Sequence, residues 1–527
     1  MSESTGVPQT PAPERPVAAV VILAAGEGKR MRSARSKLLH EIAGHSLLSY
    51  AVGAATALEP EHVVVVVGHG RDQVEAHLTE IAPHVQTVVQ AEQRGTGHAV
   101  QVALAALPEL HGEVLVTYGD VPMLTGETLA ELVRAHRAAG RAVTVLTAQV
   151  DDPTGYGRVL RDDVGEVLGI VEHRDATTEQ RAVDEINSGI YVFEPRTLAD
   201  GLARLQPTND QGELYLTDVL ASARTAGGSV GALVTPDRWQ TEGVNDRVQL
   251  GRMSAEVNRR LLERWMRAGV TVLDPASTWL HATVDLAEDV TLLPGTSLEG
   301  ATSVAAGATI GPDTTLVDVE VGEGATVVRT HGSLAVIGAG ASVGPFAYLR
   351  PGTVLGVGGK IGTFVETKNA RIGAGAKVPH LTYAGDAEIA DGANVGAGVI
   401  FANYDGVHKS TSTVGRNSFV GSDSVLVAPV HVADGAYVAA GSTITGDVGA
   451  GELAVSRGRQ RNVAGWVARK RAGTKTARAA EEALADDVGT PGSSGARETD
   501  DQRVVPAPQP DPPAGPEQAS EENERQP

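Results

Sequence analysis

A glycine-rich turn with basic neighbours, near the start of the chain, has the residue types that bind phosphate groups. Residues 23–31 read Leu-Ala-Ala-Gly-Glu-Gly-Lys-Arg-Met, and Ser36-Lys37 follows them. Small residues let the backbone approach an anion, backbone N–H groups donate to it, and lysine and arginine offset its charge. The segment is neither a dinucleotide fingerprint, because Met31 takes the third glycine position, nor a Walker motif, because no Ser or Thr follows Gly28-Lys29. A phosphate site and a surface turn with basic neighbours both remain open.

A second group of reactive side chains lies between residues 350 and 409. It comprises Arg350, Lys368, His380, Tyr383, Asn394, Asn403, Tyr404 and Lys409. Histidine suits general base catalysis because its pKa lies near neutral pH, and arginine and lysine bind phosphates. Taken alone, however, one of fifteen histidines is by default a surface residue, and charged residues usually form a solvated face.

The elements that would position the first group alternate between short apolar runs and helical patterns. Consecutive apolar residues at 18–23, 63–67, 114–117 and 143–146 predict strands buried on both faces. Residues 95–107 and 125–139 predict helices. Residues 17–245 therefore predict a doubly wound, Rossmann-like α/β domain, in which ligands bind at the carboxyl ends of the strands. Residues 246–269 predict a connecting helix, because apolar residues recur there at helical spacing.

The second group lies in a segment with a six-residue period, which we assign to residues 270–471. Aliphatic residues recur in three runs: Leu292, Leu298, Val304, Ile310 and Leu316; Ile337, Val343, Leu349, Leu355 and Ile361; and Val414, Val420, Leu426, Val432, Val438 and Ile444. Such a repeat predicts a parallel β-helix whose coils each contain three hexads. The phase slips between 316 and 321, 361 and 372, and 401 and 414, where we expect inserted loops. Arg350 and Lys368 lie three hexads apart, so regular coils would stack them on one face.

Composition excludes several classes of function. A chain of 527 residues with a formal charge of −21 is unlike a general nucleic-acid binder. The absence of cysteine excludes disulfides, thiolate zinc sites and a cysteine nucleophile. No apolar run near the start reaches the ~20 residues that a membrane helix needs, so we expect a cytoplasmic protein. Residues 1–16 and 472–527, the latter rich in proline and acids, predict disordered tails.

Three motifs together decide between the open alternatives. They are residues 23–31 with Lys37, residues 90–99 (Gln-Ala-Glu-Gln-Arg-Gly-Thr-Gly-His-Ala) and residues 118–122 (Tyr-Gly-Asp-Val-Pro). This set resembles sugar-1-phosphate nucleotidyltransferases. With the six-residue repeat behind it, residues 17–470 resemble the bacterial bifunctional N-acetylglucosamine-1-phosphate uridylyltransferases / glucosamine-1-phosphate N-acetyltransferases. The resemblance implies that the β-helix is left-handed, and that the chain acetylates glucosamine-1-phosphate with acetyl-CoA and then joins the product to UTP for cell-wall synthesis.

The resemblance also implies roles for individual residues. Those that match uridine nucleotide and sugar contacts are Leu23, Ala24, Ala25, Gly26, Lys37, Gln90, Gly95, Thr96, Tyr118, Gly119, Asp120, Gly157, Glu172, Asn187 and Asn245. Arg30 and Lys37 match the catalytic cations, and Asp120 and Asn245 match the ligands of Mg²⁺. His380 matches the general base of acetyl transfer; Arg350, Lys368, Tyr383 and Asn394 match contacts to glucosamine-1-phosphate. Ala397, Asn403, Tyr404, Ser422, Ala440 and Arg457 match the acetyl-CoA site, with Lys409 beside it. Family members assemble as trimers in which neighbouring chains complete the acetyl site.

The sequence departs from the family pattern at two positions. Lys29 stands where a small Thr or Ser is usual, and Ser36 replaces a proline before Lys37. Lys29 could tighten nucleotide binding or crowd the loop, and Ser36 removes the fixed φ of proline. Two other functions are the alternatives: a nucleotidyltransferase with one activity, for example on glucose-1-phosphate, whose β-helix only oligomerises it, and a non-catalytic scaffold or nucleotide sensor. The full set of motifs favours the bifunctional enzyme.

Overall fold

The first part of the chain is built on one nine-stranded sheet. The computed structural model describes residues 15–207, 209 and 211–488. The sheet has the order β11-β7-β10-β6-β1-β4-β5, and β8 and β9 extend it beside β10. Its strands are β1 (Ala19–Ala24), β4 (His62–Val67), β5 (Gln86–Val89), β6 (Val114–Tyr118), β7 (Val143–Gln149), β8 (Arg158–Arg161), β9 (Val167–Val171), β10 (Glu185–Phe193) and β11 (Val230–Val234). A two-stranded hairpin, β2 (Glu41–Ile42) and β3 (His45–Ser46), lies outside it. The four strands predicted from apolar runs are confirmed as β1, β4, β6 and β7.

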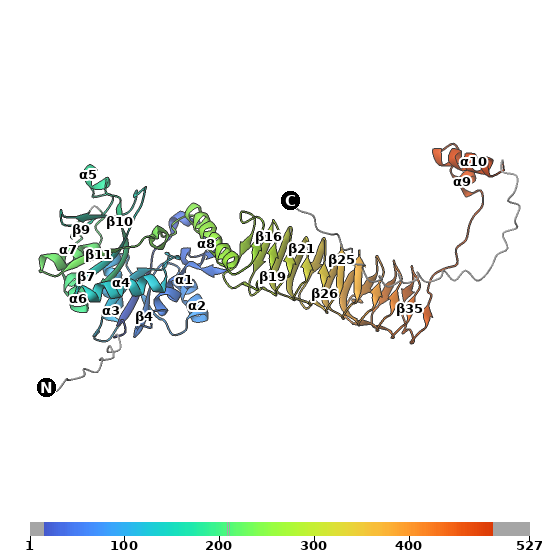
Figure 1. Cartoon of the computed structure of the whole chain (residues 1–527), viewed down its shortest axis with the longest axis horizontal. Helices are drawn as coiled ribbons and strands as arrows, with labels where there is room; N and C mark the ends of the chain where they lie inside the picture. Colours follow the sequence, from blue (N-terminus) through green and yellow to red (C-terminus); the bar gives the residue numbers. More distant parts are fainter. Residues whose placement is uncertain (1–14, 208, 210, 489–527) are drawn as a thin grey trace, which may run out of the picture. The chain divides into compact units, whose positions relative to one another are not determined.

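The sheet contains antiparallel pairs, whereas we expected only parallel strands. β1 pairs in parallel with both β4 and β6, but β10 runs antiparallel to β6 and β7. The four strands predicted from apolar runs all run in one direction, because β6 and β7 are both antiparallel to β10, which was not among them. Helices cover both faces of the sheet, as Figure 1 shows, so the Rossmann-like architecture itself is confirmed.

Alternate residues of β1 connect the sheet to two cores. Val20 and Ile22 belong to the apolar cluster that includes residues of α1, α2 and α4, whereas Val21 and Leu23 belong to the cluster that includes residues of α3, α6 and α7. The helices are α1 (Leu47–Thr56), α2 (Arg71–Ile81), α3 (Thr96–Ala105), α4 (Gly126–Ala138), α5 (Thr178–Arg181), α6 (Pro195–Arg204), α7 (Thr217–Thr225), α8 (Arg247–Arg267), α9 (Trp466–Lys470) and α10 (Lys475–Val488). The helices predicted at 95–107 and 125–139 are confirmed as α3 and α4. Burial on both sides explains why the strands read as continuous apolar runs.

The predicted connecting helix is α8. The side chain of Asp246 caps its first turn by accepting hydrogen bonds from the N–H groups of Val248 and Gln249. Farther along, buried Asn258 donates to the carbonyl of Thr278 at 2.8 Å and accepts from the N–H of Leu280 at 3.0 Å. One amide side chain therefore satisfies two backbone groups of the first coil that follows.

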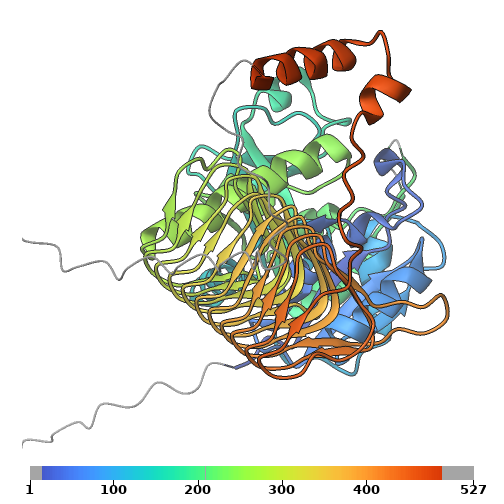
Figure 2. The same ribbon diagram turned by 90° about the vertical axis from the view of Figure 1, so that its right-hand side faces the viewer.

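Residues 271–454 form a parallel β-helix, whose coils are stacked one behind another in Figures 1 and 2. Its strands on one face are β12 (Thr271–Val272), β15 (Thr291–Leu292), β18 (Thr309–Ile310), β20 (Thr326–Val327), β22 (Ser342–Val343), β25 (Lys360–Thr363), β27 (Lys377–His380), β29 (Asn394–Val395), β32 (Phe419–Val420), β35 (Tyr437–Val438) and β37 (Leu453–Ala454). The other two faces share β13 (Trp279–Leu280), β14 (Asp285–Leu286), β16 (Thr296–Glu299), β17 (Ser303–Val304), β19 (Thr314–Val321), β21 (Thr330–Ile337), β23 (Ala347–Leu349), β24 (Val354–Leu355), β26 (Glu366–Ile372), β28 (Tyr383–Ile389), β30 (Ile400–Ala402), β31 (Ser412–Val414), β33 (Val425–Val427), β34 (Val430–Val432) and β36 (Thr443–Ile444).

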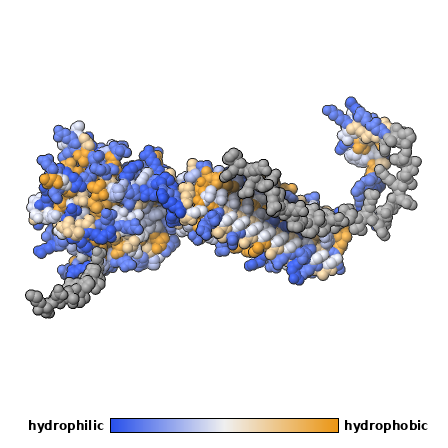
Figure 3. Space-filling view, viewed as in Figure 1, coloured by the Kyte–Doolittle hydropathy of each residue, from blue (hydrophilic) through white to orange (hydrophobic). Residues whose placement is uncertain are grey.

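The interior of the β-helix confirms the six-residue prediction. Every aliphatic residue in the three predicted runs is buried, with at most 4% of its surface exposed. Two residues before some of these aliphatic residues, buried threonines such as Thr296 and Thr353 donate to nearby carbonyls at 2.7 Å. In the space-filling view, side chains on the visible face of the β-helix form regular rows that follow the coils (Figure 3).

Two of the three slips in the repeat do not mark inserted loops, so that prediction was wrong there. β19 and β26 run continuously through the slips, and each turns a corner at one residue with left-handed backbone, Asp318 (φ 54°) or Asn369 (φ 44°). A coil that turns in this way needs one residue fewer: Thr309 pairs with Thr326 rather than with the residue eighteen positions on. The third slip holds a real insertion, in which Tyr404 and Lys409 form an isolated antiparallel bridge.

The end of the chain differs from its predicted organisation. The last β-helix strand ends at Ala454, so residues 455–471, assigned to this domain from sequence, add no further coil. The prediction of disorder from residue 472 was wrong over Lys475–Val488, which form α10. This segment begins with alanine, lysine and arginine, which favour helix, whereas the prolines of the tail begin only at Pro491. Residues 1–14 and 489–527 of the predicted tails lie outside the described residues.

Candidate active sites

A cavity of about 330 Å³ opens at the carboxyl ends of β1 and β6, where the fold predicts a ligand site. Its lining includes most of the residues predicted to hold a uridine nucleotide: Leu23, Ala24, Ala25, Gly26, Lys37, Gln90, Gly95, Thr96, Tyr118, Asp120 and Asn245. Gly95 has φ 104°, and a Cβ atom there would lie 2.6 Å from the carbonyl oxygen of Leu214. The chain can therefore approach this closely only with glycine at the start of α3.

Two side-chain oxygen atoms, from Asp120 and Asn245, lie near the Lys37 ammonium inside this cavity. The Lys37 ammonium forms an ion pair with the Asp120 carboxylate and lies 3.4 Å from the Asn245 side-chain oxygen. Asp120 and Asn245 are 125 residues apart in sequence, and the backbone bond from Val244 N–H to the Asp120 carbonyl joins their segments. One carboxylate and one amide oxygen, both able to reach a single positive charge, fit a hard divalent metal that takes its other ligands from water and phosphate. Among the described residues, no group of three or more His, Cys, Asp or Glu side chains is placed to hold a metal alone.

The three predicted sugar contacts also meet, beside the cavity rather than in its lining. A Cβ atom on Gly157 would lie 3.4 Å from both Asn187 Cβ and Glu172 Oε1. The Asn187 N–H donates to the Gly157 carbonyl at 2.9 Å, and its side-chain oxygen accepts from Tyr191 Oη at 2.8 Å. Three segments thus present a small residue, a carboxyl and an amide to one point, a combination that can bind sugar hydroxyl groups.

Burial shifts the pKa values of two residues, one among the predicted sugar contacts and one in the lining of the nucleotide cavity. It raises the pKa of Glu172, and the charges of Asp175 and Asp218 raise it further. Burial also raises the pKa of Tyr118, with smaller contributions from Glu172 and Asp120. The ring of Tyr118 lies against Gly189, where a Cβ atom would be 2.3 Å from the ring. The Tyr118 hydroxyl is therefore neutral. Its side chain lines the nucleotide cavity, and its pKa is affected by the charge of Glu172, one of the predicted sugar contacts.

Some predicted residues are not brought into the cavity lining. Arg30 is exposed in the short helix of residues 29–31, and Gly119 donates its N–H to the Leu23 carbonyl behind the site. Lys29, a departure from the family pattern, has a side chain that is 77% exposed and pairs with Glu27 at 2.7 Å. Lys29 does not line the cavity and therefore does not crowd it.

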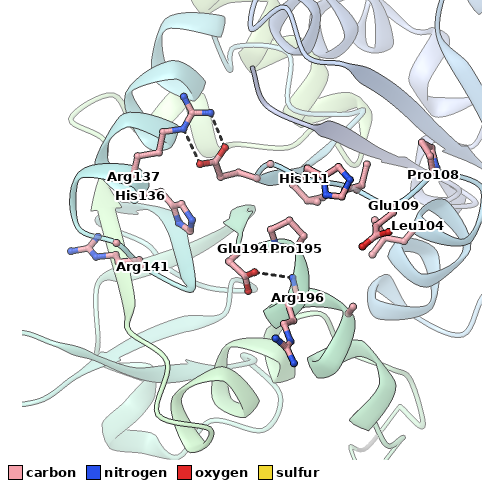
Figure 4. Close-up of a pocket in the computed structure, with 16 residues that line it drawn as sticks. Leu104, Pro108, Glu109, His111, His136, Arg137, Arg141, Glu194, Pro195 and Arg196 are labelled. Carbon is pink, nitrogen blue, oxygen red and sulfur yellow. Dashed lines mark hydrogen bonds and ion pairs between the residues drawn. The ribbon is translucent and has the colours of Figure 1, made fainter. Parts of the chain in front are cut away.

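A larger hollow, of about 1000 Å³, lies at the opposite end of the sheet, where β6 begins and β10 ends (Figure 4). None of the sequence-predicted site residues lines it. Two acids that line it are already bonded: Arg137 pairs with Glu113 at 2.7 Å, and Glu194 accepts from the N–H of Arg196 at the start of α6. Most of the residues predicted to bind the nucleotide line the smaller cavity instead, which is therefore the candidate site.

On the β-helix, four of the six predicted acetyl-CoA residues form a column along one corner, and the other two, Asn403 and Tyr404, lie away from it, at the insertion that follows β30. Each carbonyl in the column accepts from the next coil: His380 from Gly398 N–H at 3.1 Å, Ala397 from Asp423 N–H at 2.7 Å, Ser422 from Gly441 N–H at 2.8 Å, and Ala440 from the Arg457 guanidinium at 2.7 Å. Successive coils rise by about 4.8 Å. His380, exposed at the end of β27, therefore begins a row of small residues that ends at a cation, a shape suited to an extended phosphorylated cofactor.

Three of the four predicted sugar-phosphate residues, Arg350, Lys368 and Tyr383, gather on the adjacent face, whereas Asn394 lies in β29, on the face of β27. Arg350 and Lys368 occupy neighbouring coils, since Leu349 pairs with Thr367, and Arg350 bonds to Glu366 at 2.8 Å. Contact with the Lys368 ammonium lowers the pKa of Lys409. Two ammonium groups in contact on an exposed surface form a favourable site for a phosphate.

A buried carboxylate lies among these cations and amides. Asp386 accepts hydrogen bonds from Asn369 at 2.8 Å and from Asn403 at 2.5 Å. Burial opposes ionisation of Asp386, but these two bonds and the charges of Lys368 and Lys409 outweigh it and lower its pKa. Asp386 therefore stays ionised and fixes the buried Asn403, one of the predicted acetyl-CoA residues.

His380 and the basic pair lie on different faces of the β-helix. His380 ends β27 on one face, whereas Lys368 belongs to β26 on another. The chain turns from the first face to the second just after His380, at Leu381, whose backbone is left-handed (φ 51°). The base and the phosphate-binding cations thus lie on either side of one corner.

Sequence reasoning missed four residues of the nucleotide cavity. Leu38, Gln93, Ala99 and Glu213 line it together with the predicted set. Gln93 also fixes the glycine-rich turn, because its side chain donates to the Ala25 carbonyl at 2.7 Å. Glu213 follows the turn signal Asn209-Asp210-Gln211-Gly212 just before α7, and that signal could have indicated a functional loop.

Comparison with known proteins covers both parts of the chain. Residues 20–185 match the MobA-like NTP transferase domain. The chain is 58% identical over 478 residues to the bifunctional protein GlmU of Kineococcus radiotolerans, which spans 90% of this chain and 97% of that protein. It is 56% identical over 480 residues to that of Pseudarthrobacter chlorophenolicus (90% and 98%) and 55% over 466 residues to that of Streptomyces coelicolor (88% and 97%).

Proposed function

The chain belongs to the family of bifunctional GlmU proteins, and from this premise we propose which of its residues perform the two reactions. The enzyme makes UDP-N-acetylglucosamine, a precursor for the cell wall. It acetylates glucosamine-1-phosphate with acetyl-CoA and transfers UMP from UTP to the resulting N-acetylglucosamine-1-phosphate. The proposal assigns uridylyl transfer to residues 17–245 and acetyl transfer to the β-helix.

In uridylyl transfer, a phosphate oxygen of the sugar attacks the α-phosphorus of UTP and pyrophosphate leaves. Attacker and target are both anionic, so the protein must offset repulsion and align the groups. We assign the nucleotide to the glycine-rich turn and the cavity, and the sugar to Gly157, Glu172 and Asn187. Lys37 and Arg30 are the proposed catalytic cations. Convergence of Lys37, Asp120 and Asn245 in one cavity supports this assignment.

Nucleotidyltransferases of this family use a divalent metal ion, and we propose Mg²⁺ held by Asp120 and Asn245. Mg²⁺ suits two protein oxygens because it keeps water and phosphate in its shell. When bound, it supplies positive charge to the phosphates. Lys37 contacts both of the same oxygens in the structure, so the residues that would hold the metal also hold the lysine in position.

In acetyl transfer, we propose that His380 takes a proton from the glucosamine ammonium, so that the free amine attacks the thioester and CoA leaves. Arg350, Lys368, Tyr383 and Asn394 would bind the sugar phosphate. Ala397, Asn403, Tyr404, Ser422, Ala440 and Arg457 would bind acetyl-CoA. The corner column that begins at His380 supports the cofactor assignment, and the contact of Lys368 with Lys409 supports a phosphate nearby.

We further propose a homotrimer in which a neighbouring chain completes each acetyl site. One observation supports it: Phe346, Phe364 and Leu381 expose more than half of their surface on successive coils. Exposed apolar ladders of this kind usually mark interfaces. Sedimentation equilibrium of the full chain would give the mass of three chains; a monomer at micromolar concentration that is active in acetyl transfer would contradict this proposal.

A cytoplasmic location is part of the same proposal. None of the described helices has the length and apolar character needed to span a membrane.

The observation that carries the proposed function is that the polar residues form two separate sites, one in each domain. A coupled assay tests it with glucosamine-1-phosphate, acetyl-CoA, UTP and MgCl₂, omitting one component at a time. Omission of UTP should leave CoA release intact and stop pyrophosphate release. Omission of acetyl-CoA should stop both, and N-acetylglucosamine-1-phosphate should then restore pyrophosphate release alone. Pyrophosphate release from glucose-1-phosphate at a comparable rate would instead support a nucleotidyltransferase with one activity.

A further inference from the structure

One arginine of the α/β domain is buried without an acidic partner. Only 1% of the surface of Arg158, the first residue of β8, is exposed. Its guanidinium donates to the Tyr156 carbonyl, to His173 Nδ1 at 3.3 Å and to the Arg181 carbonyl at 3.4 Å. Its Nε has no acceptor among the described residues. All three acceptors are thus neutral.

Burial of the charged Arg158 side chain destabilises the folded protein, so we expect this residue to have a role that outweighs the cost. Burial lowers the pKa of Arg158, the neighbouring charge of Arg181 lowers it further, and the charge of Asp152 opposes them with the smallest contribution. Burying a charge without a carboxylate bonded to it is costly. The same strand shows the usual solution: Arg161 bonds to both carboxylate oxygens of Glu185 at 2.6 Å. The two arginines of β8 therefore provide a comparison between a more exposed arginine that is paired with a carboxylate and a buried arginine that bonds only to neutral groups.

The acceptors of Arg158 flank the proposed sugar contacts. Tyr156 directly precedes Gly157, and His173 directly follows Glu172. The third acceptor, Arg181, ends α5, and its own side chain donates to the carbonyls of His173 and Arg174 at 3.2 and 3.3 Å. One planar guanidinium thus ties together the Gly157 turn, the end of β9 and the segment of residues 173–181.

The contacts also explain why the residue is an arginine. A guanidinium directs several N–H groups outward in one plane, whereas a lysine ammonium is a compact charge that cannot span acceptors on three segments. A neutral side chain would remove the cost of burying the charge but would leave these acceptors without donors.

From these contacts we infer that Arg158 is a positioning residue for uridylyl transfer, which holds Gly157 and Glu172 at the spacing that binds N-acetylglucosamine-1-phosphate. The inference rests on the proposed function of that pocket. Arg158 does not touch the substrate, because it is buried behind the two residues that would. Its loss therefore acts on recognition of the sugar phosphate, and the nucleotide site across Tyr118 stays intact.

The test compares Arg158→Met and Arg158→Lys with Arg161→Met in the full chain. Both Arg158 variants should raise the KM for N-acetylglucosamine-1-phosphate about tenfold or more, because small misplacements of binding groups have effects of this size. The KM for UTP should stay within about twofold, and acetyl transfer by the same preparation should equal that of the wild type. Arg161→Met leaves Glu185 with the hydrogen bond from Thr147 but without its ion-pair partner; it should lower Tm and leave the KM for the sugar phosphate unchanged.

A benchmark separates failure of this inference from failure of the proposed function. Glu172→Ala removes a proposed sugar contact directly and should also raise the KM for the sugar phosphate. If Glu172→Ala leaves this KM unchanged, the assignment of the sugar pocket is wrong. If Glu172→Ala raises it and the Arg158 variants do not, Arg158 has no positioning role. Equal effects of Arg158→Met and Arg161→Met on this KM would likewise overturn the inference, because they would reflect lost stability alone.

Discussion

The α/β domain and the β-helix place their candidate sites differently. The α/β domain encloses a cavity, whereas the β-helix carries its site on its outer surface. Loops at the carboxyl ends of β1 and β6 surround a cavity, and the side chains in and beside it are partly buried. The β-helix has no such space, because aliphatic residues and threonines fill its interior. Its reactive residues must therefore lie on outer faces and corners, where His380 is exposed.

This difference teaches how each domain can adjust the chemistry of its residues. Burial raises the pKa of Glu172 and Tyr118 beside the nucleotide cavity. On the β-helix, neighbouring charges act instead: Lys368 lowers the pKa of Lys409 across exposed surface. An open face can only become a closed site when another surface covers it, which is why the proposed trimer matters to one reaction and not to the other.

The largest expected effect separates the two sites completely. His380→Ala should lower acetyl transfer about 10²–10⁴-fold, the usual contribution of a general base. Uridylyl transfer from N-acetylglucosamine-1-phosphate should be unchanged, because the substituted residue lies on the β-helix. Both rates can be measured on one preparation, by CoA release and by pyrophosphate release. His431→Ala, which replaces another exposed histidine of the β-helix, is the matched control. Parallel loss of both activities in a folded His380→Ala variant would show that the sites are not separate.

The reciprocal change should disable only the cavity. Asp120→Asn should reduce uridylyl transfer roughly 100-fold or more, because a bound metal contributes several kcal/mol of charge stabilisation. It also removes the carboxylate that pairs with Lys37, while acetyl transfer should remain. Raising MgCl₂ should recover part of the lost rate if the metal is only bound more weakly. Asp72→Asn, at an exposed position in α2, is the control. Full uridylyl activity of Asp120→Asn at low MgCl₂ would refute the metal assignment.

How much the sequence could predict also differs between the two regions. The β-helix follows from local periodicity, since each buried aliphatic residue is predicted from the residue six positions before it. The tightened corners at Asp318 and Asn369 could not be predicted, because a left-handed residue and a loop both appear as a shift of phase. In the α/β domain, the motif residues were predicted, but the meeting of Gly157, Glu172 and Asn187 depends on how β8, β9 and β10 pair. Arg158 gives no signal in sequence, because only its burial distinguishes it from Arg161.

A third prediction addresses the open face. Lys368→Met should raise the KM for glucosamine-1-phosphate about tenfold, in line with the loss of one charge-assisted hydrogen bond. The effect should shrink as salt is added, because exposed charges are screened. Lys360→Met, an equal change of charge on a different face of the β-helix, should have no effect on this KM. An equal rise in both variants would mean that general attraction, and not a phosphate site at Lys368, accounts for the change.

The smallest expected effect concerns stability and distinguishes a buried carboxyl from an exposed one. Because the pKa of Glu172 is raised in the folded protein, its carboxyl is best tolerated while protonated, and stability is lost as pH rises through that raised pKa. Glu172→Gln removes this loss. It should leave Tm unchanged near pH 4 and raise it at pH 8 by about 2–4 °C, the shift that ~1 kcal/mol produces in a domain of this size.

Calorimetry can assign this change to the correct domain, because UTP should raise the Tm of the α/β domain alone. The control is Glu366→Gln on the β-helix. Glu366 has a side chain that is 42% exposed and pairs with Arg350, so the substitution removes an exposed ion pair and should not raise Tm at any pH. A gain in Tm for Glu172→Gln that is equally large at pH 4 would mean that a change in packing, and not removal of the buried charge, causes the gain. A similar gain for Glu366→Gln would remove the contrast between a cavity that modifies its acids by burial and a face that leaves them in water.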